Sequence, residues 1–66
     1  MDKALEAFQL NTELFPEDAN VWDSLGEAYL EKGNKEKALA YYTKALQLDP
    51  EMPSAKEMVG KLQKME

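Results

Sequence analysis

The chain has 66 residues, which is enough for one small hydrophobic core and leaves little room for a second domain or a deep catalytic cleft. Its 13 acidic and 8 basic residues give a net charge of −5, so neither nucleic acid nor an anionic membrane surface is expected as a partner. Cysteine is absent, and no apolar stretch reaches the roughly 20 residues that a membrane span needs. We expect a soluble protein, cytoplasmic by default, whose compartment these features leave open.

The first half of the chain contains two segments with the apolar spacing of amphipathic helices. The first is expected over residues 2–14 and ends near Pro16, because a proline disfavours helical geometry in the residue before it. The second is expected over residues 19–32. Asp18 can act as its N-cap, and Gly33 can supply the left-handed residue that commonly ends a helix.

The second half contains two further helical segments. One is expected over residues 35–48 with Asn34 as its cap, and the short turn before it predicts an antiparallel hairpin. The other is expected over residues 53–65 and begins at Pro53, where a missing amide costs nothing. No segment alternates with the period of two that a strand needs, so the sequence predicts an all-α protein of four antiparallel helices.

The first and last predicted helices differ in their apolar surface. The first has a broad apolar face, which comprises Ala4, Leu5, Ala7, Phe8, Leu10 and Leu14. The last has a single apolar stripe, which comprises Ala55, Met58, Val59 and Leu62. A last helix with one buried face is what the end of a helical stack requires.

The sequence also repeats itself with a period of 34 residues. The shift places Lys3, Ala4 and Leu5 on Lys37, Ala38 and Leu39, Pro16 on Pro50, and Gly26 on Gly60. Within this period a spaced set of large and small residues occurs, namely Trp22, Leu25, Gly26, Tyr29, Ala38, Tyr42, Ala45 and Pro50. The period and the set resemble the tetratricopeptide repeat family, which implies an α-α superhelix that binds other proteins.

The resemblance covers the whole chain as a single unit over residues 1–66. It implies one full repeat over residues 19–52, the second helix of a preceding repeat over 1–18, and the first, capping helix of a following repeat over 53–66. The chain departs from the family pattern at Asn11, Lys56 and Gln63. The last two replace aromatic residues, which suits a helix whose outer face meets water.

The sizes of the residues in this set can also be explained by helix packing alone. Gly26 and Ala38 are small enough for helix backbones to approach, and Trp22, Tyr29 and Tyr42 are large enough to fill the space between helix pairs. Burying each large side chain contributes roughly 1.5 to 3 kcal/mol. A ligand-binding role for Trp22 is the alternative, but its spacing from Tyr29 favours a structural role.

Catalytic chemistry has little support in the sequence. There is no histidine or cysteine, and neither Ser24 nor Ser54 has an evident base. Glu13, Glu17 and Asp18 lack the loop spacing of a calcium site. We therefore expect no enzyme activity, no metal and no cofactor.

A group of three acidic residues lies on the second predicted helix. Asp23, Glu27 and Glu31 are spaced at i, i+4 and i+8, so they form an acidic stripe along one face. Repulsion at this spacing costs roughly 0.2 to 0.5 kcal/mol per pair, so the stripe can exist as a solvated face without a partner. The alternative is a binding surface.

The family resemblance implies that this stripe lies in a concave peptide groove. The candidate groove residues are Asn20, Asp23, Glu27, Leu30 and Glu31, with Ser54, Glu57, Lys61 and Lys64 on the facing helix. In chaperone-binding members, basic residues at such positions grip a C-terminal carboxylate. Acidic residues stand here instead, so a basic or mixed-charge peptide is the expected partner.

The opening helix suggests self-association as a second interaction. Leu10 occupies the position that Lys44 takes one repeat later, so apolar surface replaces polar surface there. Leu5, Phe8, Leu10 and Phe15 are the candidate contact residues for a preceding helix, a catalytic domain or another copy of the chain. Two-fold pairing or an exchange of helices would make a homodimer.

A second resemblance concerns residues 8–30. This segment, with the run Ser24-Leu25-Gly26-Glu27-Ala28-Tyr29, is similar to repeat tails that follow bacterial serine-hydrolase and beta-lactamase-like domains. The resemblance implies an alternative to a free-standing scaffold, namely a C-terminal accessory fragment of a larger bacterial enzyme. The active site of that enzyme would lie outside this chain.

Overall fold

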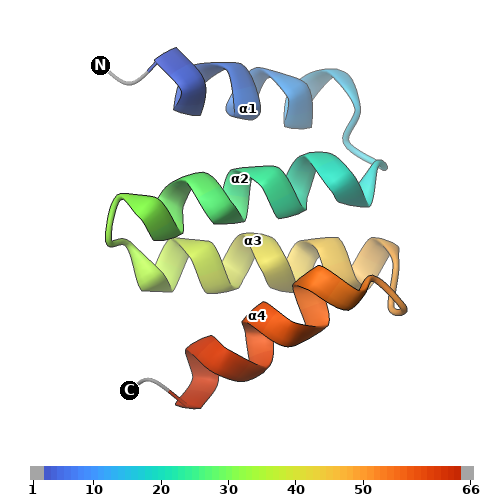
Figure 1. The fold of residues 1–66 in the computed structure, drawn as a ribbon. Helices are drawn as coiled ribbons and strands as arrows, with labels where there is room; N and C mark the ends of the chain where they lie inside the picture. Colours follow the sequence, from blue (N-terminus) through green and yellow to red (C-terminus); the bar gives the residue numbers. More distant parts are fainter. Residues whose placement is uncertain (1–2, 65–66) are drawn as a thin grey trace.

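The computed structural model describes residues 3–64, which form four helices and no strand. The helices are α1 (Lys3–Leu14), α2 (Ala19–Glu31), α3 (Lys35–Leu48) and α4 (Pro53–Lys64). Figure 1 shows them stacked in chain order, with α1 and α4 at opposite ends and α4 inclined across α3. The described part of the chain measures 29 × 25 × 13 Å, and the predicted all-α architecture is confirmed.

The predicted boundaries agree closely with the structure, apart from one end. The third predicted helix has the observed bounds. The second was expected to include Lys32, which instead lies in the turn, where its N–H donates to the carbonyls of Ala28 and Tyr29. The predicted first residue of α1 and last residue of α4, Asp2 and Met65, lie outside the described residues.

The predicted caps are present. The N–H of Asn20 donates to Asp18 Oδ1 at 2.9 Å, and the N–H of Lys37 donates to Asn34 Oδ1 at 3.1 Å. These bonds satisfy amides of the first turn that have no partner within the helix. Gly33 has φ 82°, so it takes the left-handed conformation that lets α2 stop and α3 begin two residues later.

The core lies mainly between α2, α3 and α4. Its buried apolar residues are Ala19, Leu25, Tyr29, Ala38, Tyr42, Ala45, Met52, Ala55 and Leu62. Ala38, Ala45 and Ala55 are completely buried, which allows the backbones of neighbouring helices to come close. Leu25 is the largest side chain that is fully buried.

The expected apolar face of α1 is divided in the structure. Leu5 and Phe8 pack against the core, but Leu10 and Leu14 are 52% and 59% exposed. At 100° per residue, Leu10 and Leu14 lie about 140° and 180° around the helix from Leu5, so they point away from α2. The buried residue of α1 is Thr12, whose hydroxyl donates to the carbonyl of Gln9 at 2.6 Å.

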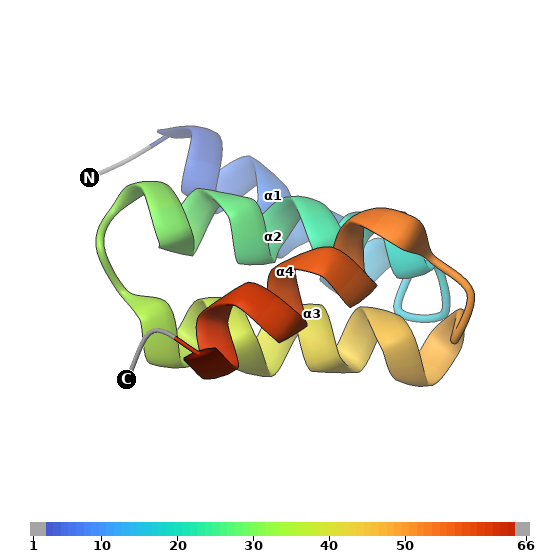
Figure 2. The ribbon, with the colours of Figure 1, turned by 60° about the horizontal axis from the view of Figure 1, so that its bottom comes forward.

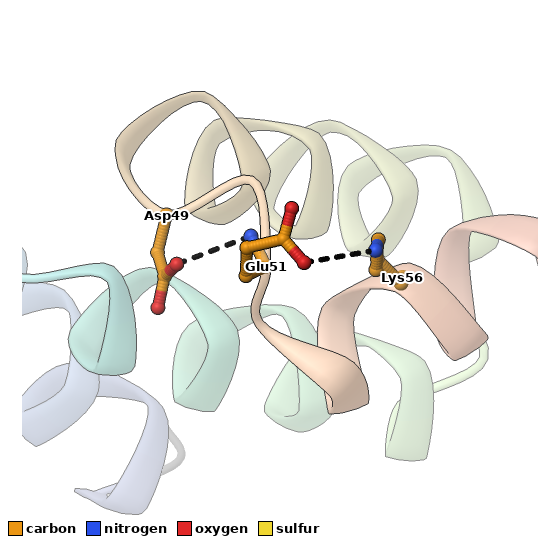
Figure 3. A network of polar contacts seen from close by, with 3 residues as sticks. All are labelled: Asp49, Glu51 and Lys56. Carbon is orange, nitrogen blue, oxygen red and sulfur yellow. Dashed lines mark hydrogen bonds and ion pairs between the residues drawn. The ribbon is translucent and has the colours of Figure 1, made fainter.

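The turn between α3 and α4 is held by local polar contacts, which Figure 3 shows from close by. The N–H of Glu51 donates to Asp49 Oδ1 at 3.1 Å, and the carboxylate of Glu51 lies 3.6 Å from Lys56 Nζ. Met52 follows and is buried, which anchors the chain before α4 begins at Pro53. The turn leads into α4, which is inclined across α3 in Figure 1.

None of the helices within residues 3–64 has both the length and the apolar character needed to cross a membrane.

Candidate functional site

A groove lies between α2 and α4 and has a volume of about 310 Å³. Three helices supply its lining, which comprises Asp23, Glu27, Leu30 and Glu31 of α2, Tyr42 of α3, and Ser54, Glu57 and Met58 of α4. In Figure 2 the first turns of α4 lie next to α2, and its last turns descend to the level of α3, which runs below α2 in this view. Helices α2 and α4 therefore form the walls, and α3, which lies between them in the sequence, forms the floor.

A hydrogen bond joins the two walls. The hydroxyl of Ser54 donates to Asp23 Oδ1 at 3.2 Å, across 31 residues of sequence. The contact is solvent-exposed, so its net contribution to stability is about 1 kcal/mol or less. It is a direct contact between the α2 and α4 walls of the groove.

Tyr42 forms the floor and is 2% exposed. Its ring lies against Gly26 of α2, where a Cβ atom would be 3.2 Å from three of the ring carbons. The absence of a side chain at position 26 lets the ring pass beneath α2 toward the acidic wall. Within residues 3–64 the Tyr42 hydroxyl has no hydrogen-bond partner, although it is not fully enclosed.

The surroundings of Tyr42 change its acidity. Burial, followed by the nearby carboxylates of Asp23, Glu27 and Glu31, raises the pKa of Tyr42 from 10.0 to about 12. Both causes disfavour the phenolate, because it would be poorly solvated and repelled by like charge. The hydroxyl is therefore protonated at neutral pH and can both donate and accept a hydrogen bond.

The groove is acidic on both walls. Asp23, Glu27, Glu31 and Glu57 contribute four carboxylates, and no basic side chain belongs to the lining. Lys61 Nζ lies 3.6 Å from Glu57 Oε1, but both side chains are more than 60% exposed. Solvent screens such a pair, so it reduces the negative field of the groove only weakly.

The structure gathers six of the nine candidate groove residues into the lining, namely Asp23, Glu27, Leu30, Glu31, Ser54 and Glu57. Asn20, Lys61 and Lys64 are exposed and do not belong to this lining.

Sequence reasoning missed Tyr42 and Met58 as groove residues. Both were assigned to packing, and Tyr42 does pack, but its hydroxyl end also reaches the groove. One signal could have suggested this. The signal is Gly26, which lies against the ring of Tyr42 in the adjacent helix. Because glycine has no side chain, it leaves a path for Tyr42 to reach the groove on the other side of α2.

Trp22 lies outside the groove lining, in an aromatic stack on another face of α2. Its ring lies 5.9 Å from that of Tyr41, which lies 5.3 Å from that of Tyr29. The indole N–H donates to the carbonyl of Pro16 at 2.9 Å, and Lys44 Nζ is 5.6 Å from the indole ring. These contacts give Trp22 a structural role that links α2, α3 and the preceding turn.

The candidate self-association residues do not share one face. Leu5 and Phe8 are half-buried against the core, whereas Leu10 and Phe15 are 52% and 55% exposed. Leu14, which is 59% exposed, belongs with the second pair and was absent from the candidate set. The exposed apolar patch at this end is therefore Leu10, Leu14 and Phe15.

No group of three or more acidic, histidine or cysteine side chains gathers closely enough in residues 3–64 to hold a metal ion. The carboxylates of the groove are therefore spread along its walls and do not form a compact cluster.

A helical hairpin flanked by two further helices, with a sequence period of 34 residues, is typical of an α-helical repeat protein. The tetratricopeptide repeat model matches residues 19–52, which is more than half of the chain. The chain belongs to the tetratricopeptide repeat family. Repeats of this family are protein-interaction modules that are generally non-catalytic, and this chain is such a repeat.

Several larger proteins contain similar segments. Human protein O-mannosyl-transferase TMTC1 is 38% identical over 66 residues, which is 100% of this chain and 8% of that protein. Human superkiller complex protein 3 is 56% identical over 36 residues, 54% of this chain and 2% of that protein. The peroxisomal targeting signal receptor of Candida albicans is 34% identical over 59 residues, 89% of this chain and 10% of that protein. The chain therefore spans a tenth or less of these relatives.

Proposed function

We propose that this interaction module holds an extended segment of a protein partner, of basic or mixed charge, in the groove between α2 and α4. The observation that carries the proposal is a lining with four carboxylates and no basic side chain. Leu30, Tyr42 and Met58 add apolar surface between the acidic positions. Such a site combines charge, which selects the partner, with apolar contacts, which hold it.

Two further facts support a partner with positive charge. The chain has a net charge of −5, so its field steers cations toward it and repels anions. Asp23 and Glu27 occupy positions where a C-terminal carboxylate would meet like charge. The similarity to a protein named as a targeting signal receptor supports segment recognition as the mode of binding.

The test is a nuclear magnetic resonance titration of the ¹⁵N-labelled chain with two blocked ten-residue peptides. One peptide has three lysines among alanines and leucines, and the other has glutamates in their place. We expect the lysine peptide to shift amide signals of α2 and α4 and the glutamate peptide to leave them unchanged. Equal effects of the two peptides, or shifts confined to α1, would contradict the proposal.

Matched charge variants test whether the lysine peptide binds in the groove. Asp23→Lys with Glu27→Lys reverses two charges inside the groove, whereas Glu13→Lys with Glu36→Lys reverses two exposed charges that are not part of the lining. Both double variants change the net charge by the same amount. We expect the first to abolish binding of the lysine peptide and the second to weaken it only slightly, because general steering is screened by salt.

We propose self-association through the exposed patch as a second function of the chain. Ala38 and Ala45 of α3 are completely buried, but Ala4 and Asn11, which lie 34 residues earlier on α1, are exposed and half-buried. The face of α1 that corresponds to the α2-facing side of α3 is thus uncovered. Lys56 and Gln63 at the opposite end are polar and exposed, which favours pairing of two α1 faces over a head-to-tail stack.

Sedimentation equilibrium over a wide concentration range tests self-association. We expect a dimer that dissociates on Leu10→Lys, which should fold because Lys44 occupies the equivalent position of α3. Ala40→Lys, at an exposed position of α3, is the control and should leave the dimer intact. A monomer at all concentrations would exclude this second function and leave the groove proposal unaffected.

The accessory role in a larger enzyme is a further candidate. This role is supported by the similarity of the whole chain to a small part of a protein named as a transferase. That the larger enzyme is a bacterial hydrolase stays a prediction. The reading frame upstream of Met1 provides the test. A catalytic domain continuous with the chain would support it, and a stop codon directly upstream would contradict it.

A further inference from the structure

Tyr42 is the feature of the groove that packing does not explain. Its ring is buried, and yet its hydroxyl has no hydrogen-bond partner within residues 3–64. Tyr29, which is also buried, differs in this respect, because its hydroxyl accepts a bond from Gln9 Nε2 at 2.8 Å. Because the hydroxyl oxygen is not among the buried unpaired atoms, it is reached from the groove and is available to a partner from outside the chain.

The groups around that hydroxyl define what the partner is. The same wall carries Asp23, Glu27 and Glu31 on successive helical turns. The Cβ atoms of residues four apart on a helix are about 6 Å from each other. Asp23 accepts from Ser54 but retains free lone pairs, and Glu27 has no ion pair within residues 3–64. A ligand with several N–H donors and a positive charge matches these acceptors, and an anion would be repelled.

We propose that Tyr42 and the carboxylates of Asp23, Glu27 and Glu31 form a subsite for one cationic side chain of the partner, an arginine or a lysine. The proposal rests on the function proposed for the groove and names the group that the groove selects. The cationic N–H groups donate to two of these carboxylates, one helical turn apart, and to the phenolic oxygen of Tyr42. The Tyr42 hydroxyl then donates its own proton to a neighbouring carboxylate.

The spread of the acceptors argues for a side chain and against a metal ion. The acidic groups of residues 3–64 do not converge as a metal site requires. A guanidinium has five donors in a planar fork and an ammonium has three, so either can connect acceptors that stand a helical turn apart. Because more of its donors can be used, we expect arginine to bind more tightly than lysine.

The probes for the test are blocked pentapeptides with alanine and glycine around one central residue. That central residue is arginine, lysine, citrulline or glutamate. Citrulline keeps the length and planar shape of arginine but has no charge. Titrations are followed by amide shifts of α2 and α4 and by the ring signals of Tyr42. We expect binding in the order arginine, lysine, then citrulline, with no shift for glutamate.

Two substitutions separate recognition from packing. Tyr42→Phe removes the hydroxyl and keeps the ring on Gly26, and Tyr41→Phe is the matched control in the aromatic stack outside the groove. We expect about tenfold weaker arginine binding for Tyr42→Phe, as befits a hydrogen bond to a charged group, and no change for Tyr41→Phe. Glu27→Gln should weaken arginine binding and leave citrulline binding unchanged. Thermal unfolding of each variant establishes that it is folded.

The outcomes distinguish this subsite from the groove as a whole. If the longer lysine peptide binds between α2 and α4 but Tyr42→Phe and Glu27→Gln bind the arginine probe as the parent does, the subsite is overturned and the groove stands. If arginine and citrulline probes bind equally, the subsite is likewise overturned. If no basic peptide shifts α2 and α4, both proposals fail together.

Discussion

Gly26 of α2 and Tyr42 of α3 are in direct contact, because a Cβ atom built at position 26 would lie 3.2 Å from three carbons of the Tyr42 ring. The contact determines two properties of the molecule. It sets the approach of the two helices of the hairpin, and it directs the Tyr42 hydroxyl toward the acidic wall of the groove. A single glycine thus couples the packing of the hairpin to the lining of the groove.

Substitution of Gly26 by alanine tests this contact. Alanine is favoured over glycine inside a helix by about 1 kcal/mol. Overpacking a core costs about 1 to 3 kcal/mol, and Tyr42 is buried and has little room to move. We expect Gly26→Ala to lower the free energy of unfolding by about 1 kcal/mol, measured by urea denaturation with circular dichroism.

Gly60→Ala is the matched control for that substitution. Gly60 lies within α4, and nothing would stand within 4 Å of a Cβ atom there. The helix-propensity gain is then unopposed, so we expect stabilisation by up to about 1 kcal/mol. The two alanine variants should change stability in opposite directions. Stabilisation by both would show that Tyr42 accommodates the extra methyl group.

Gly33→Ala addresses the turn between α2 and α3. Gly33 has φ 82°, a conformation in which a Cβ atom is strained even though nothing crowds the site. We expect a loss of about 1 kcal/mol in the free energy of unfolding, and a smaller loss for Gly33→Asn, because asparagine tolerates this region. Equal stability of the parent and the alanine variant would contradict the assignment of strain at this turn.

Trp22→Phe separates structural from ligand-binding roles of the indole. The substitution removes the bond from the indole N–H to the carbonyl of Pro16 and shortens the stack on Tyr41. We expect a destabilisation of about 1 kcal/mol. Peptide binding in the groove, followed in the same titration, should be unchanged. Weaker binding with full stability would instead assign Trp22 to a binding surface.

The acidity of Tyr42 predicts a pH dependence of stability. The phenol has a pKa of 10.0 when unperturbed and of about 12 in the folded chain, so the folded state holds the proton more tightly. Its contribution to stability is complete below pH 10 and is lost as the pH rises toward 12. The loss amounts to about 3 kcal/mol at most, because each pKa unit corresponds to about 1.4 kcal/mol.

The measurement compares urea denaturation of the parent and of Tyr42→Phe between pH 8 and pH 12. Titration of the lysines and of the other tyrosines affects both proteins alike. The parent should therefore lose more stability than the variant over the upper part of this range. Parallel pH profiles would show that the Tyr42 hydroxyl titrates at its ordinary pKa.

The local rules of helix formation predicted most of the fold from sequence. Three residues mark helix ends through local chemistry. The side chains of Asp18 and Asn34 accept hydrogen bonds from amides of the first turn, and Gly33 takes the left-handed conformation that ends a helix. The acidic wall was also predictable, since residues four apart on a helix share a face whatever the helix packs against. These features depend on neighbours along the chain, which the sequence lists in order.

The outward direction of Leu10 and Leu14 was decided by tertiary packing. Periodicity shows that α1 has apolar residues on several sides, but it does not show which side a neighbour covers. The buried side contains Thr12. A polar residue can be buried there because its hydroxyl donates to the carbonyl of Gln9 and needs no partner from another helix. Gln9 in turn donates to the hydroxyl of Tyr29 on α2.

The sequence by itself determined the class of protein, the helix boundaries and the negative charge of the candidate surface, because each follows from spacing along one helix or from composition. The tertiary structure decided which residues share the groove. Tyr42 and Met58 join the acidic wall only because α4 crosses α3 beside α2 and because Gly26 leaves a path for the Tyr42 ring. Both conditions depend on the angle and distance between helices, and these are set by contacts between residues far apart in the chain.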